Sequence, residues 1–260
     1  MLQQLNQILN QHPLKAWRSE DFSGIDQLHL GGRPATEELA AWLPNTAKIG
    51  LDIGCGLGGT SRYLAQLHDC KMTGLDLNDA YIKAAVLLNQ CLPKQPNCQF
   101  VVGNSLTLPF EDERFDFVVS QHATMNITAK SELLNGLHRV LKLGACVLLH
   151  EVMLQDDITA DQVTYPTPWA STNTHSHLCT WKAFETLAKA AGFSVMRFED
   201  TTSAALDWIH QARTVGQHRP KSPFTAKLAL GHAAGVMSAN VLDNITRQRL
   251  QIISAMLVKL

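Results

Sequence analysis

The residues best suited to chemistry begin with a glycine-rich segment that follows an apolar stretch of the chain. Residues 52–58 read Asp-Ile-Gly-Cys-Gly-Leu-Gly. Glycines at a turn from a strand into a helix let backbone amides come close to a ligand, because no Cβ intervenes. Gly54, Gly56 and Gly59 fit the dinucleotide pattern G-x-G-x-x-G, whereas Gly54, Gly56 and Gly58 fit the tighter pattern G-x-G-x-G. The turn therefore indicates a ligand that contains adenosine, and by itself it leaves two ligand classes open.

Two acids flank this turn in the sequence. Asp76 ends the next apolar stretch, at the position where an acid commonly binds a ribose. Its structural alternative is a charge at a helix N-terminus, where Asn78 competes as the N-cap residue. Asp52 precedes the glycines, and its negative charge would repel a pyrophosphate but attract an ammonium group. Asp52 therefore favours an adenosine ligand with an amino-acid tail over a dinucleotide.

Around these residues the sequence alternates between apolar stretches and amphipathic stretches. Strands are expected at residues 48–53, 71–76, 100–102, 115–120, 145–152, 193–199 and 252–258. Helices are expected at residues 1–10, 34–43, 80–88, 130–141 and 180–191, and another after the glycines, through Leu64 and Leu67. Strands that alternate with helices predict an α/β fold with a mostly parallel, Rossmann-like sheet of seven strands and helices on both faces.

The regions outside this alternation predict additions to the core. We expect an N-terminal helical cap over residues 1–44, with its first helix ended at Pro13 and its second beginning near Pro34. The core itself is expected to comprise residues 45–200 and 246–260. Residues 201–245 read as a helical insertion, or lid, and Gly192 is well placed to end the helix before it.

Further motifs follow the glycine turn in a fixed order. They are Gly103-Asn104-Ser105, Leu108-Pro109-Phe110, the strand from Phe115 to Ser120, and the segment from Arg139 to Gly144. With the turn and Asp76, this ordered set resembles the seven-strand (class I) S-adenosylmethionine-dependent methyltransferases over roughly residues 48–151. Within that superfamily the sequence is most similar to the small-molecule branch, such as the sarcosine and dimethylglycine methyltransferases. The resemblance implies methyl transfer to a small-molecule nitrogen, oxygen or carbon, and a last strand that runs antiparallel.

The resemblance also implies a role for each residue that matches a family motif. Gly54, Gly56 and Gly58 would line the methionyl part of S-adenosyl-L-methionine, and Gln121 would lie by its sulfonium. The full set expected to bind this cofactor is Asp52, Gly54, Cys55, Gly56, Gly58, Asp76, Leu77, Asn104, Ser105 and Gln121. Asn104 stands where the family usually has an aspartate, so it can donate a hydrogen bond as well as accept one.

The substrate side is expected at the ends of the strands and in the cap. His122 follows the fourth strand, where open α/β sheets bind ligands, and it is the candidate general base; a structural histidine is the alternative. His29, Met125 and Trp169 are candidate substrate-binding residues. His29 also suits closing the cofactor pocket, and ordinary packing is the alternative for Trp169. The small-molecule N-methyltransferases usually carry an acid where this chain has His122, which leaves oxygen and carbon acceptors open.

Two other functions are weighed against methyl transfer. An NAD(P)-dependent oxidoreductase would need a hydride site such as Y-x-x-x-K, and no tyrosine of this sequence has a lysine four residues later. A donor-binding subunit without activity would keep the same glycines and acids, so only turnover separates it from an enzyme.

Composition narrows the partners and the location. The net charge of −1 provides no basic surplus for a nucleic acid partner. Six scattered cysteines without a C-x-x-C pair indicate reduced thiols in a cytoplasmic protein, and no membrane insertion is expected. The pair His175 and His177 lacks a third ligand at a suitable spacing, so no metal site is predicted. A homodimer remains open.

Overall fold

The computed structural model describes residues 1–12, 15–215 and 222–260. Its strands are β1 (Ile49–Ile53), β2 (Lys71–Asp76), β3 (Cys98–Val102), β4 (Phe115–Gln121), β5 (Leu141–Leu154), β6 (Phe193–Asp200) and β7 (Leu250–Lys259). Its α-helices are α1 (Leu2–Asn10), α2 (Ser23–Asp26), α3 (Gly32–Ala40), α4 (Gly59–Leu67), α5 (Asp79–Gln90), α6 (Lys130–Val140), α7 (Trp181–Ala190), α8 (Thr202–Val215), α9 (Ala226–Leu230) and α10 (Ala234–Thr246).

The strands form one seven-stranded sheet in the order β3-β2-β1-β4-β5-β7-β6. The pairings from β3 to β5 are parallel, whereas β7 lies antiparallel between β5 and β6. The strand order reverses between β1 and β4. The chain continues from β1 to β2 on one side of this point and from β4 to β5 on the other, and open α/β sheets bind ligands at such a point. The predicted fold class is confirmed, including the antiparallel last strand.

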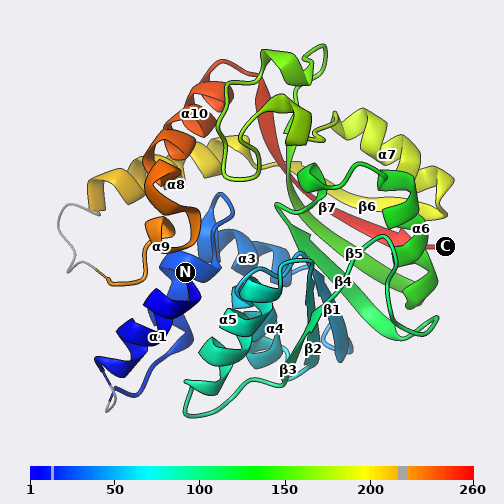
Figure 1. Cartoon of the computed structure of the whole chain (residues 1–260). Helices are drawn as coiled ribbons and strands as arrows, with labels where there is room; N and C mark the ends of the chain where they lie inside the picture. The colour runs from blue at the N-terminus through cyan, green and yellow to red at the C-terminus, as the bar shows by residue number, and fades with distance from the viewer. Residues whose placement is uncertain (13–14, 216–221) are drawn as a thin grey trace.

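Alternation along the central strands places a separate apolar core on each face of the sheet. In β4, Val118 belongs to the core that packs against α6 and α7, whereas Phe117 and Val119 belong to the core under α3 and α4. Both sets are fully buried, which is the pattern expected of strands covered on two sides. Figure 1 shows the helices grouped on the two sides of the sheet.

The helical additions pack as third and fourth apolar clusters at the edge of this core. Leu5 and Leu9 of α1 pack with Phe22, Phe224 and Leu88, and so join the N-terminal segment to α5. Val241 and Ile245 of α10 pack on the ends of β5 and β7. In Figure 1, α1, α8, α9 and α10 gather beside one end of the sheet.

Several predicted boundaries shift. The second predicted helix begins at Gly32 rather than near Pro34, so Pro34 lies in its first turn. The fifth strand is longer than residues 145–152, because it continues through the irregular stretch around Gly144 to start at Leu141. The insertion is helical as expected, but α10 runs on to Thr246. The expected stop at Pro13 lies outside the described residues.

Candidate functional site

One cavity of about 620 Å³ lies at the carboxyl ends of the central strands, within the usual range for a small-molecule site. It is bordered by the glycine turn after β1, the ends of β2 and β4, and the helical segments of the cap and insertion. Of the residues predicted from the sequence, it brings together Asp52, Gly54, Cys55, Gly56, Asp76, Gln121, His29, His122, Met125 and Trp169.

The glycine turn has the backbone geometry that its residues suggested. Gly54, Gly56 and Gly58 have φ angles of +68°, +53° and +78°, a region that side chains with a Cβ rarely adopt. The amides of Gly54 and Cys55 both donate to the Leu75 carbonyl, at 2.8 and 3.1 Å, which anchors the turn to β2. A Cβ at Gly56 would meet nothing within 4 Å, whereas one at Gly58 would lie 2.5 Å from the Phe100 ring. Gly56 therefore faces open space, and Gly58 serves the packing of the turn.

Asp76 holds the turn from the neighbouring strand. Its Oδ2 accepts a hydrogen bond from the Gly56 amide at 2.9 Å, and its Oδ1 accepts one from the Asn78 amide at 2.8 Å. Asn78 is the N-cap of α5, as expected, and accepts from the Ala80 amide at 3.0 Å. Asp76 thus borders the cavity with a carboxylate that the backbone has already oriented. Leu77 beside it is 73% exposed and does not line the cavity.

Asp52 is a buried carboxyl beneath the turn. It is 2% exposed, and its Oδ2 accepts a hydrogen bond from Ser61 Oγ at 2.6 Å. Burial raises the pKa of Asp52 to about 7, and the nearby Asp76 charge adds to the rise. A positively charged ligand group in the cavity would counter both effects, because it favours the ionised carboxylate.

Gln121 ends β4 and lies in a network of hydroxyls. Its Oε1 is 2.6 Å from Thr60 Oγ1 and 3.2 Å from Thr36 Oγ1, so α3 of the cap and α4 of the core meet at this side chain. Its Nε2 lies 3.3 Å from Nε2 of His29. These contacts fix the amide at the mouth of the central strands.

Three histidine rings meet beside Gln121. The His122 and His150 rings stack with centroids 5.3 Å apart, and the His29 ring packs edge-on against both, at 6.0 and 5.8 Å. Burial lowers the pKa of His29 to about 3 and that of His150 to about 4, and it lowers the pKa of His122 well below its usual value. All three rings are therefore neutral at physiological pH.

The loop that carries His122 is anchored by Glu151. This carboxyl is fully buried, and it accepts hydrogen bonds from Ser120 Oγ at 2.7 Å and from the amides of Ala123 and Thr124. His122 itself has a φ of +50°, in the left-handed region that few residues other than glycine adopt. Glu151 thus holds this loop in place. Its role was not predicted from the sequence, although an acid inside an otherwise apolar strand is an unusual signal.

Other residues that line the cavity were not predicted. They include Asp26, Gln27, Thr60 and Tyr81 on the polar side, and Ile209, Ala226, Ala229, Leu230 and Val241 on the apolar side. Asp26 is the most informative of these, because it pairs with the fully buried guanidinium of Arg62, at 2.6 Å, directly behind the glycine turn. The apolar residues carried no distinguishing signal, since any amphipathic helix presents such side chains.

Some predicted residues lie apart from the cavity. Asn104 and Ser105 are not among its lining residues, and Asn104 Oδ1 accepts a hydrogen bond from the Leu106 amide at 2.9 Å. His175 is exposed and His177 is half-buried, and neither lines the cavity. Within residues 1–12, 15–215 and 222–260, no three potential metal-ligating side chains are grouped as a metal site would require.

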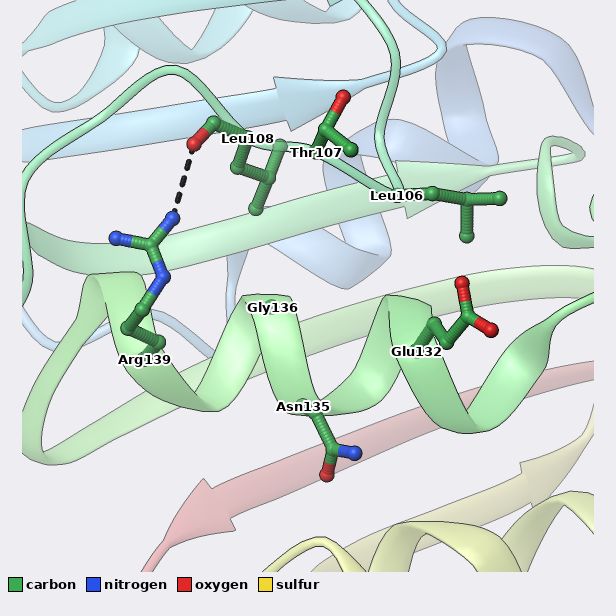
Figure 2. A pocket seen from close by; sticks show the side chains of 7 residues that line it. All are labelled: Leu106, Thr107, Leu108, Glu132, Asn135, Gly136 and Arg139. Atoms are coloured by element: carbon green, nitrogen blue, oxygen red, sulfur yellow. Dashed lines mark hydrogen bonds between the residues drawn. The ribbon is translucent and has the colours of Figure 1, made fainter.

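A second hollow, of about 510 Å³, lies between residues 106–108 and α6 (Figure 2). Its one cationic side chain, Arg139, is engaged with the protein itself: it donates to the carbonyls of Leu108 and Phe110 and pairs with Asp112. Figure 2 shows the guanidinium turned to the Leu108 carbonyl. This hollow therefore belongs to the structural joint between a loop and a helix.

The match with known families covers the segment that holds the glycine turn, Asp76 and Gln121. Residues 51–149 match the family described as "Methyltransferase domain". Over this segment the chain is similar to methyltransferase domains. The resemblance drawn from the ordered motifs is thereby confirmed.

Matches with sequence relatives cover only part of each relative. The chain is 26% identical to a 24-methylenesterol C-methyltransferase 2 of Arabidopsis thaliana over 187 residues, which are 71% of this chain and 48% of that protein. It is 38% identical to a phthiotriol/phenolphthiotriol dimycocerosates methyltransferase 1 of Mycobacterium ulcerans over 150 residues, which are 55% of this chain and 54% of that protein. The matches therefore span about half the length of these relatives.

Solved structures share the fold of the methyltransferase domain and its additions. A putative sarcosine dimethylglycine methyltransferase from Galdieria sulphuraria superposes with a TM-score of 0.68 at 19% identity, over 87% of this chain and 86% of that one. A phosphoethanolamine N-methyltransferase 2 of Haemonchus contortus, in complex with S-adenosyl-L-methionine, superposes with a TM-score of 0.75 at 18% identity, over 98% of this chain and 60% of that one.

No helix in the described part of the chain is long and apolar enough to cross a membrane.

Proposed function

We propose that this protein is an S-adenosylmethionine-dependent methyltransferase that transfers a methyl group to a small molecule by in-line displacement. One observation carries the proposal: in a methyltransferase domain, the glycine turn and the two acids Asp52 and Asp76 border a single cavity. A positively charged ligand with ribose hydroxyls matches both acids, whereas a dinucleotide would place its pyrophosphate near Asp52. The oxidoreductase alternative has no such support.

The residues at the cavity fit the donor in three places. Asp76 would receive the ribose hydroxyls, and the open space at Gly56 would admit the chain that joins the ribose to the amino acid. Asp52 would face the ammonium group, and Gln121 the sulfonium. The bound donor supplies an activated methyl group, so the protein's chief tasks are to position the acceptor and to exclude water.

Calorimetry tests this proposal directly. We expect heat of binding with S-adenosylmethionine and with S-adenosylhomocysteine, and none with NADH. Heat with NADH alone would contradict the proposal. A subunit without activity would bind the donor but release no S-adenosylhomocysteine when incubated with a metabolite extract, whereas an enzyme would release it.

Asp52 predicts how donor affinity depends on pH. Because the pKa of this carboxyl is raised to about 7, the free protein carries it protonated below that pH, and binding an ammonium must displace the proton. Affinity for S-adenosylhomocysteine should therefore fall by up to about tenfold per unit as the pH drops from about 7 to 5.5. Calorimetry across this range measures it. Asp52→Asn, which can still accept from Ser61, should make the profile flat; an equally steep profile in this variant would contradict the role of Asp52.

His122 is proposed as the general base. Its Nε2 is sealed from solvent and has no hydrogen-bond partner in the described part of the chain, so Nδ1 is the nitrogen left to exchange a proton with a ligand. A base works best when its pKa lies near the working pH, and burial holds the pKa of His122 far lower. We therefore expect a modest contribution.

His122→Asn tests this role with little effect on the backbone, because asparagine tolerates the positive φ at this position. Turnover should fall about tenfold, below the roughly 100-fold or more typical of a general base, while donor affinity stays the same. The measurement is S-adenosylhomocysteine release with an acceptor-containing extract. Unchanged turnover would make His122 a structural residue.

Two finer features are also part of the proposal. The cysteines are free thiols, which supports a reducing compartment such as the cytoplasm. A homodimer is the oligomer to test, by light scattering, because closed twofold pairs are the commonest assemblies of soluble proteins.

A further inference from the structure

The shortest hydrogen bond of His29 assigns the proton of its ring. Its Nε2 lies 2.9 Å from the Gly32 carbonyl oxygen, which can only accept, so Nε2 carries the hydrogen. The Nε2 of Gln121, itself a donor, lies farther away at 3.3 Å and makes no hydrogen bond to this protonated nitrogen. The ring is neutral, because burial holds its pKa at about 3. Its Nδ1 is therefore an unprotonated nitrogen that can only accept a hydrogen bond, and it has no partner within the described residues. The ring that carries this nitrogen borders the cavity.

The neighbouring rings cannot satisfy this nitrogen. The Nε2 of His150 donates to the Leu30 carbonyl at 2.8 Å, which leaves its Nδ1 to accept from Ser254 Oγ at 3.0 Å. Both nitrogens of His150 are thus occupied. His122 packs at ring distance from His29 and forms no hydrogen bond with it. A ligand in the cavity can supply the partner that His29 lacks.

Much of the cavity wall away from the glycine turn is apolar. It includes Met125, Trp169, Trp208, Ile209, Leu230 and Val241, with Asn126 and Ser238 as polar members. No lysine or arginine is among the lining residues in the part of the chain that is described, so nothing there would neutralise a phosphate.

The acids that line the cavity serve other groups. Asp26 pairs with Arg62. Under the proposed function, Asp52 would face the ammonium group of the donor and Asp76 its ribose hydroxyls. An ammonium group of the acceptor, placed among the neutral histidines, would lose its hydration without gaining a carboxylate of its own, so a cationic acceptor is also a poor match. A neutral molecule that donates one hydrogen bond fits this surface.

We propose that the methyl acceptor is a neutral, largely apolar molecule with a hydroxyl group, and that this hydroxyl donates its hydrogen bond to Nδ1 of His29. The inference rests on the proposed function, since it places the acceptor beside the donor in the same cavity. This hydrogen bond makes His29 a specificity-determining residue, because it binds the polar end of the acceptor.

One carbon skeleton with four head groups tests the inference: geraniol, geranyl methyl ether, geranylamine and geranyl diphosphate. Each is titrated by calorimetry into the full-length protein saturated with S-adenosylhomocysteine. Geraniol should bind at least about tenfold more tightly than the other three, the scale of one buried hydrogen bond. The ether is the sharpest comparison, because it keeps the oxygen and loses only the donated hydrogen.

His29→Phe keeps an aromatic ring but removes both nitrogens, and it should reduce the preference for geraniol over its methyl ether to less than about twofold. His29→Leu is the second variant, should the first fail to fold, because it also removes both nitrogens and keeps an apolar side chain. His175→Phe changes an exposed histidine outside the cavity and should keep the preference.

The outcomes separate the two proposals. If S-adenosylhomocysteine binds but the amine or the diphosphate binds better than geraniol, the inference is overturned and the proposed function stands. The same holds if geraniol does not bind, or if the folded His29 variants keep the full preference. If S-adenosylhomocysteine itself does not bind, both proposals fail.

Discussion

Replacement of Arg62 by methionine is expected to lower the free energy of unfolding by about 3–5 kcal/mol, the usual loss when one partner of a buried ion pair is removed. The guanidinium is fully buried, and it donates to Asp26 at 2.6 Å, to the Leu57 carbonyl at 2.7 Å and to the Ala85 carbonyl at 3.3 Å. Without it, Asp26 would remain buried, and burial already raises the pKa of this carboxyl. Chemical denaturation measures the loss.

Two further variants show whether the loss of stability comes from the Asp26 carboxyl, left buried without its partner. Lys83→Ala removes an exposed ion pair with Asp79 and should change stability by less than about 1 kcal/mol. The double variant Asp26→Asn with Arg62→Met should recover part of the loss, because it leaves no unpaired charge. A single Arg62→Met variant within about 1 kcal/mol of the parent protein would show that this pair does not hold the cap to the core.

The second large effect is expected at Asp76. Asp76→Ala should weaken binding of S-adenosylhomocysteine by about 1–3 kcal/mol, up to about 100-fold, the scale of lost hydrogen bonds to a charged group. The reason is twofold: the carboxylate borders the cavity, and it also orients the Gly56 amide at 2.9 Å. Calorimetry gives the affinity, and circular dichroism checks the fold.

Asp79→Ala is the matched control, because it removes another carboxylate only three residues away, which is 59% exposed and paired with Lys83. Its donor affinity should equal that of the parent protein. Equal affinities for Asp76→Ala and Asp79→Ala, with both proteins folded, would remove Asp76 from the donor site.

The sheet could be predicted because its signals are local. Each central strand is a short apolar run, and the turn after β1 needs glycine at positive φ, so both features are visible in neighbouring residues. Asp76 and Gln121 were found in the same way, since each ends a strand. Topology then placed them at one edge of the sheet, as the carboxyl ends of parallel strands must be.

The partners of the buried polar groups could not be predicted. His150 and Glu151 lie within an apolar strand, but the atoms that satisfy them come from Leu30, Ser120 and Ser254. Such pairs join residues between 31 and 120 positions apart, and no periodicity in a single sequence encodes them. The ion pair of Arg62 with Asp26 is of the same kind, with 36 positions between its members.

The two sides of the cavity come from different parts of the chain. The side with the glycine turn, Asp76 and Gln121 is built by residues 52–121, whereas much of the apolar wall is built by residues 208–212 and 226–241 of the insertion. A substitution in α8, α9 or α10 can therefore reshape the apolar wall without displacing a strand end. Under the proposed function, such a division allows one scaffold to diversify: the insertion can drift, be exchanged or be engineered toward new acceptors, while the half that would hold the donor stays under separate selection.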